Sequence, residues 1–349
     1  MSTLVFQICM ILAFCAHLLT PSSCHDHSRL HKKHTALFVF GDSLFDVGNN
    51  NYLNTSIELQ ANFWPYGETF FKHPTGRFSD GRLIPDMIAE YANLPLIPPY
   101  LQPGFNNYSY GVNFASSGAG SLTETFKDLY VIDLKTQLGY FKKVEKQLRH
   151  KLGDAEAHTL LLYESSPEEY VGLVIGNLTN VIKEIYKKGG RKFGFTGMAP
   201  LGCLPSMRAM KPGDTGTCVE EFNTLLKLHN RVLDKVLLKL KGHLAEFKYS
   251  YPNLYHHVNE IFNNPSKYGF KEAKTACCGS GPYRGIGSCG RKQGVTEYEL
   301  CDNVTEYVFF DSNHPTERLY KKVSKLWWSY TPKVTGAYYV SLKELFEVY

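Results

Sequence analysis

The chain has 349 residues, 43% of them hydrophobic, which is enough for one large α/β domain or two small ones and argues against intrinsic disorder. The formal net charge of +5 is small, and its charges are mixed along the sequence. Because neither a basic tail nor a nucleic-acid-binding motif is present, we expect no nucleic-acid partner.

The chain begins with an apolar stretch at 4–19, followed by small and polar residues up to Cys24. This layout predicts a secretory signal peptide over 1–24, although its first residues include no Lys or Arg. An N-terminal membrane anchor is the alternative, and Gln7 and His17 make it the poorer fit. No other segment is long and apolar enough for a stable membrane span, so we predict a secreted, extracellular protein.

The first predicted element of the mature chain is a buried strand at 36–40, directly before Gly41, Asp42 and Ser43. Parallel α/β sheets place their chemistry at the carboxyl ends of strands, and Ser43 stands at such an end. The Gly-, Asn- and Pro-rich stretch 49–82 then predicts a surface loop over the active site.

Helices and strands alternate along the rest of the chain. The periodicity predicts helices at 83–92, 134–151, 168–188, 219–241 and 316–328, and further strands at 110–115, 192–196 and 246–251. Strands separated by helices imply a mostly parallel sheet covered on both faces. Without an internal repeat or a convincing boundary, we expect one domain over 25–349.

A second polar group stands near the other end of the chain, where Asp311 and His314 precede the helix opened by Pro315 and Thr316. One turn of chain can bring the Asp311 carboxylate to one ring nitrogen of His314. The other nitrogen is then free to take a proton from a serine hydroxyl. Together with Ser43, this pair predicts a serine esterase.

Cysteine usage agrees with export. Outside the leader there are Cys203, Cys218, Cys277, Cys278, Cys289 and Cys301, an even number. We predict that Cys203 pairs with Cys218, and that Cys277 and Cys278 pair with Cys289 and Cys301 in one order or the other. A zinc site is the alternative, but no C-x-x-C spacing supports it.

Four N-x-[ST] sequons are compatible with glycosylation in the same compartment, at Asn54, Asn107, Asn177 and Asn303. Histidines 25, 27, 31 and 34 could bind a metal, but a solvated terminal tail is the preferred interpretation, so no metal site is predicted.

Several motifs carry a family resemblance. The run V-F-G-D-S-L-F-D-V-G-N-N (39–50) closely resembles the first block of the plant-type GDSL esterase/lipases, members of the SGNH hydrolase superfamily. Further matches follow in family order: F-W-P-Y-G (63–67), P-T-G-R-F-S-D-G-R (74–82), G-V-N-F-A-S-S-G-A-G (111–120), P-L-G-C-L-P (200–205), C-C-G-S-G-P-Y (277–283) and F-F-D-S-N-H-P-T (309–316). The match covers nearly the whole mature chain.

The resemblance implies a three-layer α/β/α sandwich of flavodoxin-like type with a mostly parallel sheet. It also implies hydrolysis of carboxylic esters of lipids or small molecules without metal or cofactor, in a plant extracellular space such as the apoplast or cell wall. Carried over residue by residue, Ser43 is the nucleophile, His314 the general base and Asp311 the residue that orients it. The backbone N–H groups of Ser43 and Gly118 contribute to the oxyanion hole. Acyl and alcohol specificity and oligomeric state stay open.

One family block is missing from this sequence. Family members carry a third strand that ends in Gly-x-Asn-Asp, whose asparagine supplies a third oxyanion donor, and no such run occurs in this chain. The most similar run is Gly176-Asn177-Leu178-Thr179, but it lies within a predicted helix and is not assigned this role. A shortened strand could form at Thr159–Tyr163. The central third strand is therefore expected to be shortened or missing. The alternative to an active esterase is a catalytically impaired or non-enzymatic member, an isoform or gene-model deletion, that acts as a binding protein or does not fold.

Overall fold

The computed structural model describes residues 36–150, 167–211, 216–252, 254–290, 292, 295, 297–329 and 340–347. The predicted signal peptide at 1–24, the histidines before residue 35 and the possible strand Thr159–Tyr163 all lie outside these residues. Ala36–Tyr349 is the larger of the two compact units of the chain.

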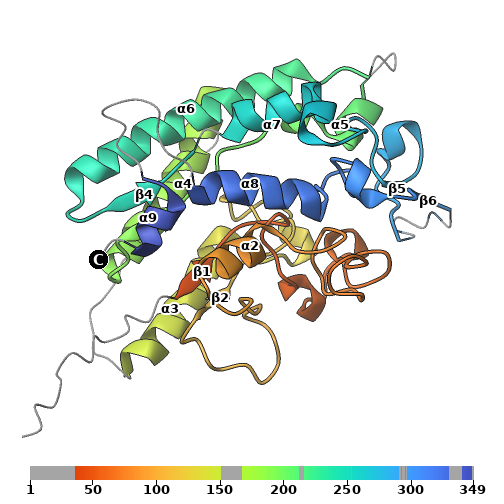
Figure 1. Cartoon of the computed structure of the whole chain (residues 1–349). Coiled ribbons are helices and arrows are strands. Elements are labelled where there is room, and N and C mark those ends of the chain that lie inside the picture. Colours follow the sequence, from red (N-terminus) through yellow and green to blue (C-terminus); the bar gives the residue numbers. More distant parts are fainter. Residues whose placement is uncertain are drawn as a thin grey trace, which may run out of the picture. The chain divides into compact units, whose positions relative to one another are not determined.

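Helices and short strands alternate through the described residues (Figure 1). The strands are β1 (Leu37–Val39), β2 (Gly111–Asn113), β3 (Lys192–Gly194), β4 (Lys248–Ser250), β5 (Cys278–Gly279) and β6 (Glu299–Leu300). The helices are α2 (Ile84–Tyr91), α3 (Leu134–His150), α4 (Pro167–Lys187), α5 (Pro205–Ala209), α6 (Glu220–His243), α7 (Leu254–Asn263), α8 (Glu317–Ser329) and α9 (Leu342–Glu347).

The strands β1 to β4 form two parallel pairs, as the alternating pattern predicts for a mixed α/β protein. β1 pairs with β2, Leu37 lying opposite Gly111, and β3 pairs with β4, Lys192 lying opposite Lys248. The described residues show these as two separate two-stranded sheets rather than one. The sequence between α3 and α4, where a further strand is expected, lies outside the described residues.

Gly111 shows why the β1–β2 pair begins where it does. Its φ is +102°, and a Cβ atom there would lie 2.0 Å from the carbonyl oxygen of Leu37. Only glycine tolerates both the positive φ and so close a backbone approach.

Regularly spaced apolar side chains explain the long helices. In α6 the buried residues include Leu226, Leu233, Leu237 and Leu240, which share one helical face. This face packs on α4 and on the β3–β4 pair, where Phe247 and Tyr249 belong to the same buried cluster. A second cluster joins α2, α7 and α8, and α8 packs directly along α2 (Figure 1).

Three disulfides hold the C-terminal half. Cys203 pairs with Cys218, as predicted, and the two orders left open for the others resolve as Cys277–Cys301 and Cys278–Cys289. The last two bonds flank the antiparallel β5–β6 pair, which the sequence patterns did not predict. They cross-link the segment 277–301 on itself, and Cys277, Cys278 and Cys289 pack in one buried cluster with Tyr66 and Phe310.

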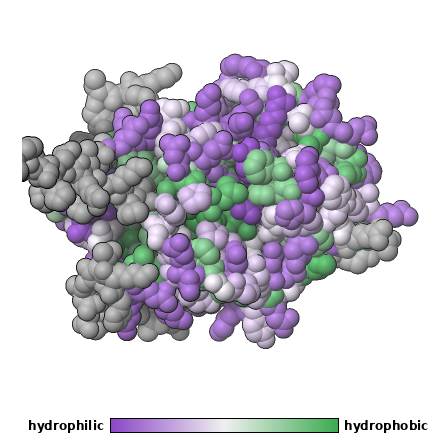
Figure 2. All heavy atoms as spheres, turned by 60° about the horizontal axis from the view of Figure 1, so that its bottom comes forward, coloured by the Kyte–Doolittle hydropathy of each residue, from purple (hydrophilic) through white to green (hydrophobic). Residues whose placement is uncertain are grey.

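The surface mixes polar and apolar residues. Figure 2 shows apolar side chains gathered near the middle of one face and bordered by hydrophilic ones. Among the described residues, no helix combines the length and hydropathy needed to cross a membrane.

Candidate active site

Ser43 lies just beyond the carboxyl end of β1, in a turn that the helix α3 secures. The buried side chain of Gln137 accepts a hydrogen bond from the Gly41 N–H at 3.0 Å and donates one to the Gly41 carbonyl at 2.9 Å. The Asp46 N–H closes the turn on the Asp42 carbonyl at 2.9 Å. The nucleophile candidate therefore stands on a backbone that is fixed from both sides.

Asp311 and His314 occupy one tight turn before α8. The Asp311 Oδ1 accepts hydrogen bonds from the backbone N–H groups of Asn313 at 2.9 Å and His314 at 2.8 Å. The Phe310 N–H donates to the His314 carbonyl at 2.8 Å, which closes the turn. Because the carboxylate organises the same turn that carries the histidine, their spacing of three residues brings the two side chains together.

The structure places the three predicted side chains in one line of contacts. The His314 Nε2 lies 2.9 Å from the Ser43 Oγ, and its Nδ1 lies 2.8 and 2.9 Å from the two Asp311 oxygens. The ring of Phe78 packs against the imidazole with centroids 4.6 Å apart. With Nδ1–H donated to the carboxylate, Nε2 is free to accept the serine proton.

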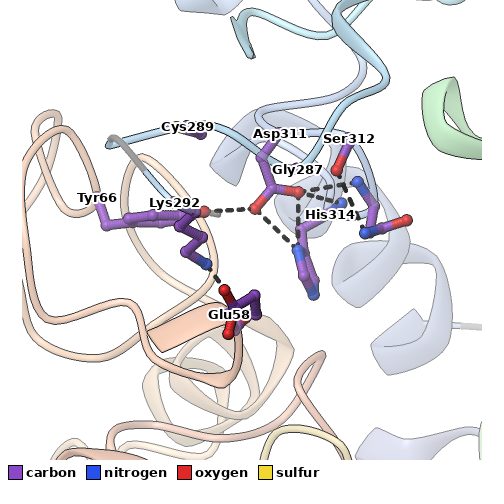
Figure 3. Close-up of a pocket in the computed structure, with 9 residues that line it drawn as sticks. Glu58, Tyr66, Gly287, Cys289, Lys292, Asp311, Ser312 and His314 are labelled. Atoms are coloured by element: carbon purple, nitrogen blue, oxygen red, sulfur yellow. Dashed lines mark hydrogen bonds and ion pairs between the residues drawn. The ribbon is translucent and has the colours of Figure 1, made fainter. Parts of the chain in front are cut away.

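Asp311 is buried, and its charge is compensated from several sides. Burial by itself raises its pKa, but His314, Lys292 and the Tyr66 hydroxyl lower it, and the net effect holds the pKa of this carboxyl well below its usual range. The Tyr66 hydroxyl donates to Oδ2 at 2.7 Å. In Figure 3 the Tyr66 hydroxyl points at this carboxylate, and the Lys292 side chain lies beside Tyr66 with its ammonium group turned toward Glu58.

The family resemblance names two backbone amides as oxyanion donors, those of Ser43 and Gly118. Within the part of the chain that the structure describes, neither the Ser43 N–H nor the Gly118 N–H has a hydrogen-bond acceptor. Gly118 has a φ of +82°, and a Cβ atom there would lie 3.1 Å from Val131 and 3.2 Å from Leu59. Glycine adopts this left-handed backbone conformation without strain, whereas other residues rarely do.

Asp46 joins the loop of Ser43 to the loop of Gly118. Its carboxylate accepts the N–H groups of Gly48 at 2.8 Å and Asn49 at 2.6 Å, and also that of Ser117 at 3.0 Å. Burial raises its pKa to about 6, against these hydrogen bonds. The residue therefore has a structural task in the site, and not that of a metal ligand.

The side chains of nearby asparagines donate hydrogen bonds to backbone carbonyls. Asn49 donates to the carbonyls of Asn113 and Ala115, Asn50 to those of Leu59 and Ser117, and Asn113 to that of Phe45. Asn177 lies within α4, as its sequence context predicts, and donates to Ser121. Each of these amides thus donates to a backbone carbonyl of the described residues.

The described residues contain one group with the spacing of metal ligands, Cys203, Cys218 and Glu220. Its two cysteines form a disulfide, so their sulfur atoms are not thiolate ligands.

Three residues of the site were not predicted from the sequence: Gln137, Tyr66 and Lys292. Gln137 is polar within the buried face of an amphipathic helix, which is a usable signal for a functional or positioning group. Tyr66 lies in a recognised motif but no role was assigned to it. Lys292 is surrounded in sequence by polar residues, and nothing there indicates that its side chain is buried.

The sequence matches known proteins over most of its length. A protein-family model described as GDSL-like Lipase/Acylhydrolase matches residues 37–327. GDSL esterase/lipase 1 of Arabidopsis thaliana is 48% identical over 353 residues, covering 93% of this chain and 94% of that protein. A GDSL lipase of Tanacetum cinerariifolium is 48% identical over 329 residues, covering 89% of this chain and 88% of that protein.

The alignment with the Arabidopsis protein spans more positions than this chain has residues, although only 93% of the chain takes part. That relative therefore has residues without a counterpart here. Both the family model and these relatives match nearly the full length, and the chain belongs to the GDSL-like lipase/acylhydrolase family of esterases and lipases.

Proposed function

We propose that the protein is a secreted serine ester hydrolase that cleaves carboxylic esters of lipids or small molecules. The observation that carries this proposal is the continuous contact from Ser43 Oγ through the imidazole of His314 to the Asp311 carboxylate. A free serine hydroxyl is a weak nucleophile, and an adjacent base that is itself oriented by a third group is what activates it.

In the proposed reaction His314 Nε2 removes the Ser43 proton while Oγ attacks the ester carbonyl carbon. Asp311 keeps the ring in the tautomer with Nδ1–H and stabilises the imidazolium that forms. His314 then returns the proton to the leaving alcohol, which leaves an acyl ester on Ser43. Water, deprotonated by the same nitrogen, attacks this ester and releases the acid.

The N–H groups of Ser43 and Gly118 are the proposed donors to the tetrahedral oxyanion. Loss of one oxyanion donor typically costs about 10²–10³ in rate, so we expect this enzyme to be slower than relatives that carry the third block. We also propose that the fold is a three-layer α/β/α sandwich. The two parallel strand pairs and the helices that alternate with them support this.

Export is supported by the disulfides, since such bonds persist in oxidising compartments. Three of the four sequons, at Asn54, Asn107 and Asn303, are exposed and suit glycan attachment, whereas the amide of Asn177 is hydrogen-bonded to Ser121. We propose an apoplastic or cell-wall location.

A second candidate is a catalytically impaired member that binds its ligand without turnover. It is favoured by the absence of Gly-x-Asn-Asp from the sequence, together with the relative's additional residues.

Hydrolysis of p-nitrophenyl esters of increasing acyl length by the wild type and Ser43→Ala separates the two. We expect turnover with the wild type and loss of at least about 10³ in kcat with the variant. Wild-type protein that melts cooperatively yet hydrolyses no ester would support the impaired alternative and overturn the esterase proposal.

A further inference from the structure

Lys292 is buried next to the catalytic turn, with 5% of its surface exposed. Its Nζ lies 4.6 Å from the ring centroid of Phe78, 4.8 Å from that of Tyr66 and 5.4 Å from that of Phe63. The ammonium group donates a hydrogen bond of 3.3 Å to the Glu58 carbonyl oxygen. A cation is thus held in an aromatic cage, where it is largely removed from water.

Two aromatic residues of this cage also contact the triad. Tyr66 covers Lys292 and donates its hydroxyl to Asp311, while Phe78 contacts both the lysine ammonium and the His314 ring. Lys292, Asp311 and His314 also line the same cavity (Figure 3). A change of charge at Lys292 is therefore felt at the Asp311–His314 pair through a medium with little water to screen it.

Several charged groups of the described residues act on this centre. Lys292 interacts with the carboxylates of Asp311 and Glu58. On the other side His314 interacts with Asp311 and with Asp42, whose pKa is raised by burial and lowered in part by this histidine. Among the described residues, Lys292 is the lysine whose charge lowers the pKa of Asp311.

We propose that Lys292 is a positioning residue of the hydrolase, an electrostatic counter-charge to Asp311 that limits the pull of this carboxylate on a proton at His314. This inference rests on the proposed serine-esterase function and extends it to the control of its pH dependence.

The physical reason is a balance of charge in a buried space. With Lys292 charged, the carboxylate of Asp311 is already compensated, and a proton taken up from solvent by His314 would add a second positive charge to the same cavity. Without Lys292 the carboxylate would attract that proton instead, and the histidine would be blocked as a base at higher pH. Burial lowers the pKa of Lys292 to about 8, so the group still carries its charge throughout the acidic range.

The test is an NMR titration of the His314 imidazole in histidine-labelled protein, assigned with His314→Gln, for the wild type, Lys292→Met and Lys292→Arg. We expect the midpoint in Lys292→Met to rise by roughly one pH unit, and that in Lys292→Arg to stay at the wild-type value. The acid limb of kcat/KM should move with it, which lowers activity on that limb about tenfold, while the plateau changes far less.

Lys322→Met is the matched control. Lys322 also lies over an aromatic ring, 5.8 Å from the Phe270 centroid, and its pKa is also lowered by burial, but Asp311 is not among the groups that shift it. Its removal should leave the His314 midpoint unchanged. Lys292→Gln is titrated beside the Met variant, so that a variant that fails to fold does not decide the outcome.

A His314 midpoint that stays within about 0.2 pH units of wild type in a folded Met or Gln variant would overturn the inference. The NMR readout does not need turnover, so absence of esterase activity in the wild type would contradict the proposed function and leave this test of Lys292 valid.

Discussion

At the scale of single residues, the site depends on buried polar groups that compensate one another. Asp311 is the centre of this arrangement: it accepts two backbone N–H groups, the Tyr66 hydroxyl and the His314 ring. A buried carboxylate without such partners would take up a proton and could no longer orient the imidazole.

Burial of the charged Lys292 side chain lowers the stability of the folded protein, and this effect can be measured. Its pKa falls from 10.5 to about 8 on folding, so between these values the unfolded chain binds more protons than the native protein. Stability must then rise with pH through this window, because the penalty for the buried charge, fully present below the folded pKa, is progressively lost.

We therefore predict that the unfolding free energy of the wild type, relative to Lys292→Met, increases by roughly 2 kcal/mol between about pH 7 and about pH 9.5. Urea unfolding of both proteins at the two pH values measures this. A difference that does not vary with pH would mean that the lysine has no lowered pKa in the native state.

The residue-level site was only partly predictable. Ser43, Asp311 and His314 follow from their motifs, and the structure brings them within hydrogen-bond distance. Gln137 and Lys292 act over a long sequence distance, and only the fold brings them to the Ser43 turn and to Asp311. Sequence patterns report local order, whereas such contacts arise from packing.

At the scale of elements, the disulfide-bonded segment 277–301 carries Lys292 into the site. The Cys278–Cys289 bond closes a loop with a sequence separation of 11, and Lys292 follows three residues later. In the chain-entropy account such a closure stabilises the protein chiefly by restricting the unfolded chain.

We predict that Cys278→Ser with Cys289→Ser lowers the unfolding free energy by about 3 kcal/mol, measured by urea unfolding, and moves the acid limb of kcat/KM upward. The pair Cys203→Ser with Cys218→Ser removes a closure of similar separation, 15 residues, without altering the segment before Lys292. It should cost similar stability and leave the acid limb in place. If the acid limb of kcat/KM shifts equally in both double variants, the shift follows from a general loss of stability and not from the position of Lys292.

Element types were more predictable than their extents. Predicted helices at 134–151 and 219–241 correspond to Leu134–His150 and Glu220–His243, because long amphipathic periodicity is a strong signal. The predicted strand at 110–115 is shorter, Gly111–Asn113, although the N–H groups of Phe114 and Ser116 still donate to the carbonyls of Val39 and Gly41. The helix Leu254–Asn263 and the β5–β6 pair were missed, the latter because disulfides rather than strand propensity define it.

At the scale of the whole molecule, the two parallel strand pairs form separate sheets among the described residues, and the sequence between the pairs contains no Gly-x-Asn-Asp run. Adjacent strands in α/β proteins normally complete one sheet, and unpaired edges are a liability for folding and association. The missing block is thus expected to limit both stability and rate.

Insertion of a strand-forming segment that ends in Gly-x-Asn-Asp between α3 and α4 tests this. We predict that kcat rises about 10²–10³-fold through the added oxyanion donor. The same insertion with alanine in place of its asparagine should recover stability in thermal unfolding but not the rate. Equal rates in both insertions would show that the asparagine donor is not what this chain lacks.

The central claim is that Ser43 is a nucleophile activated by His314. The most direct measurement is intact-mass analysis of the purified protein after reaction with a fluorophosphonate, run beside Ser43→Ala and with a thermal melt of each. The account predicts one covalent adduct on the wild type at Ser43 and none on the variant, both proteins melting cooperatively. A cooperatively folded wild type that stays unlabelled, or a variant that is labelled equally, would contradict it.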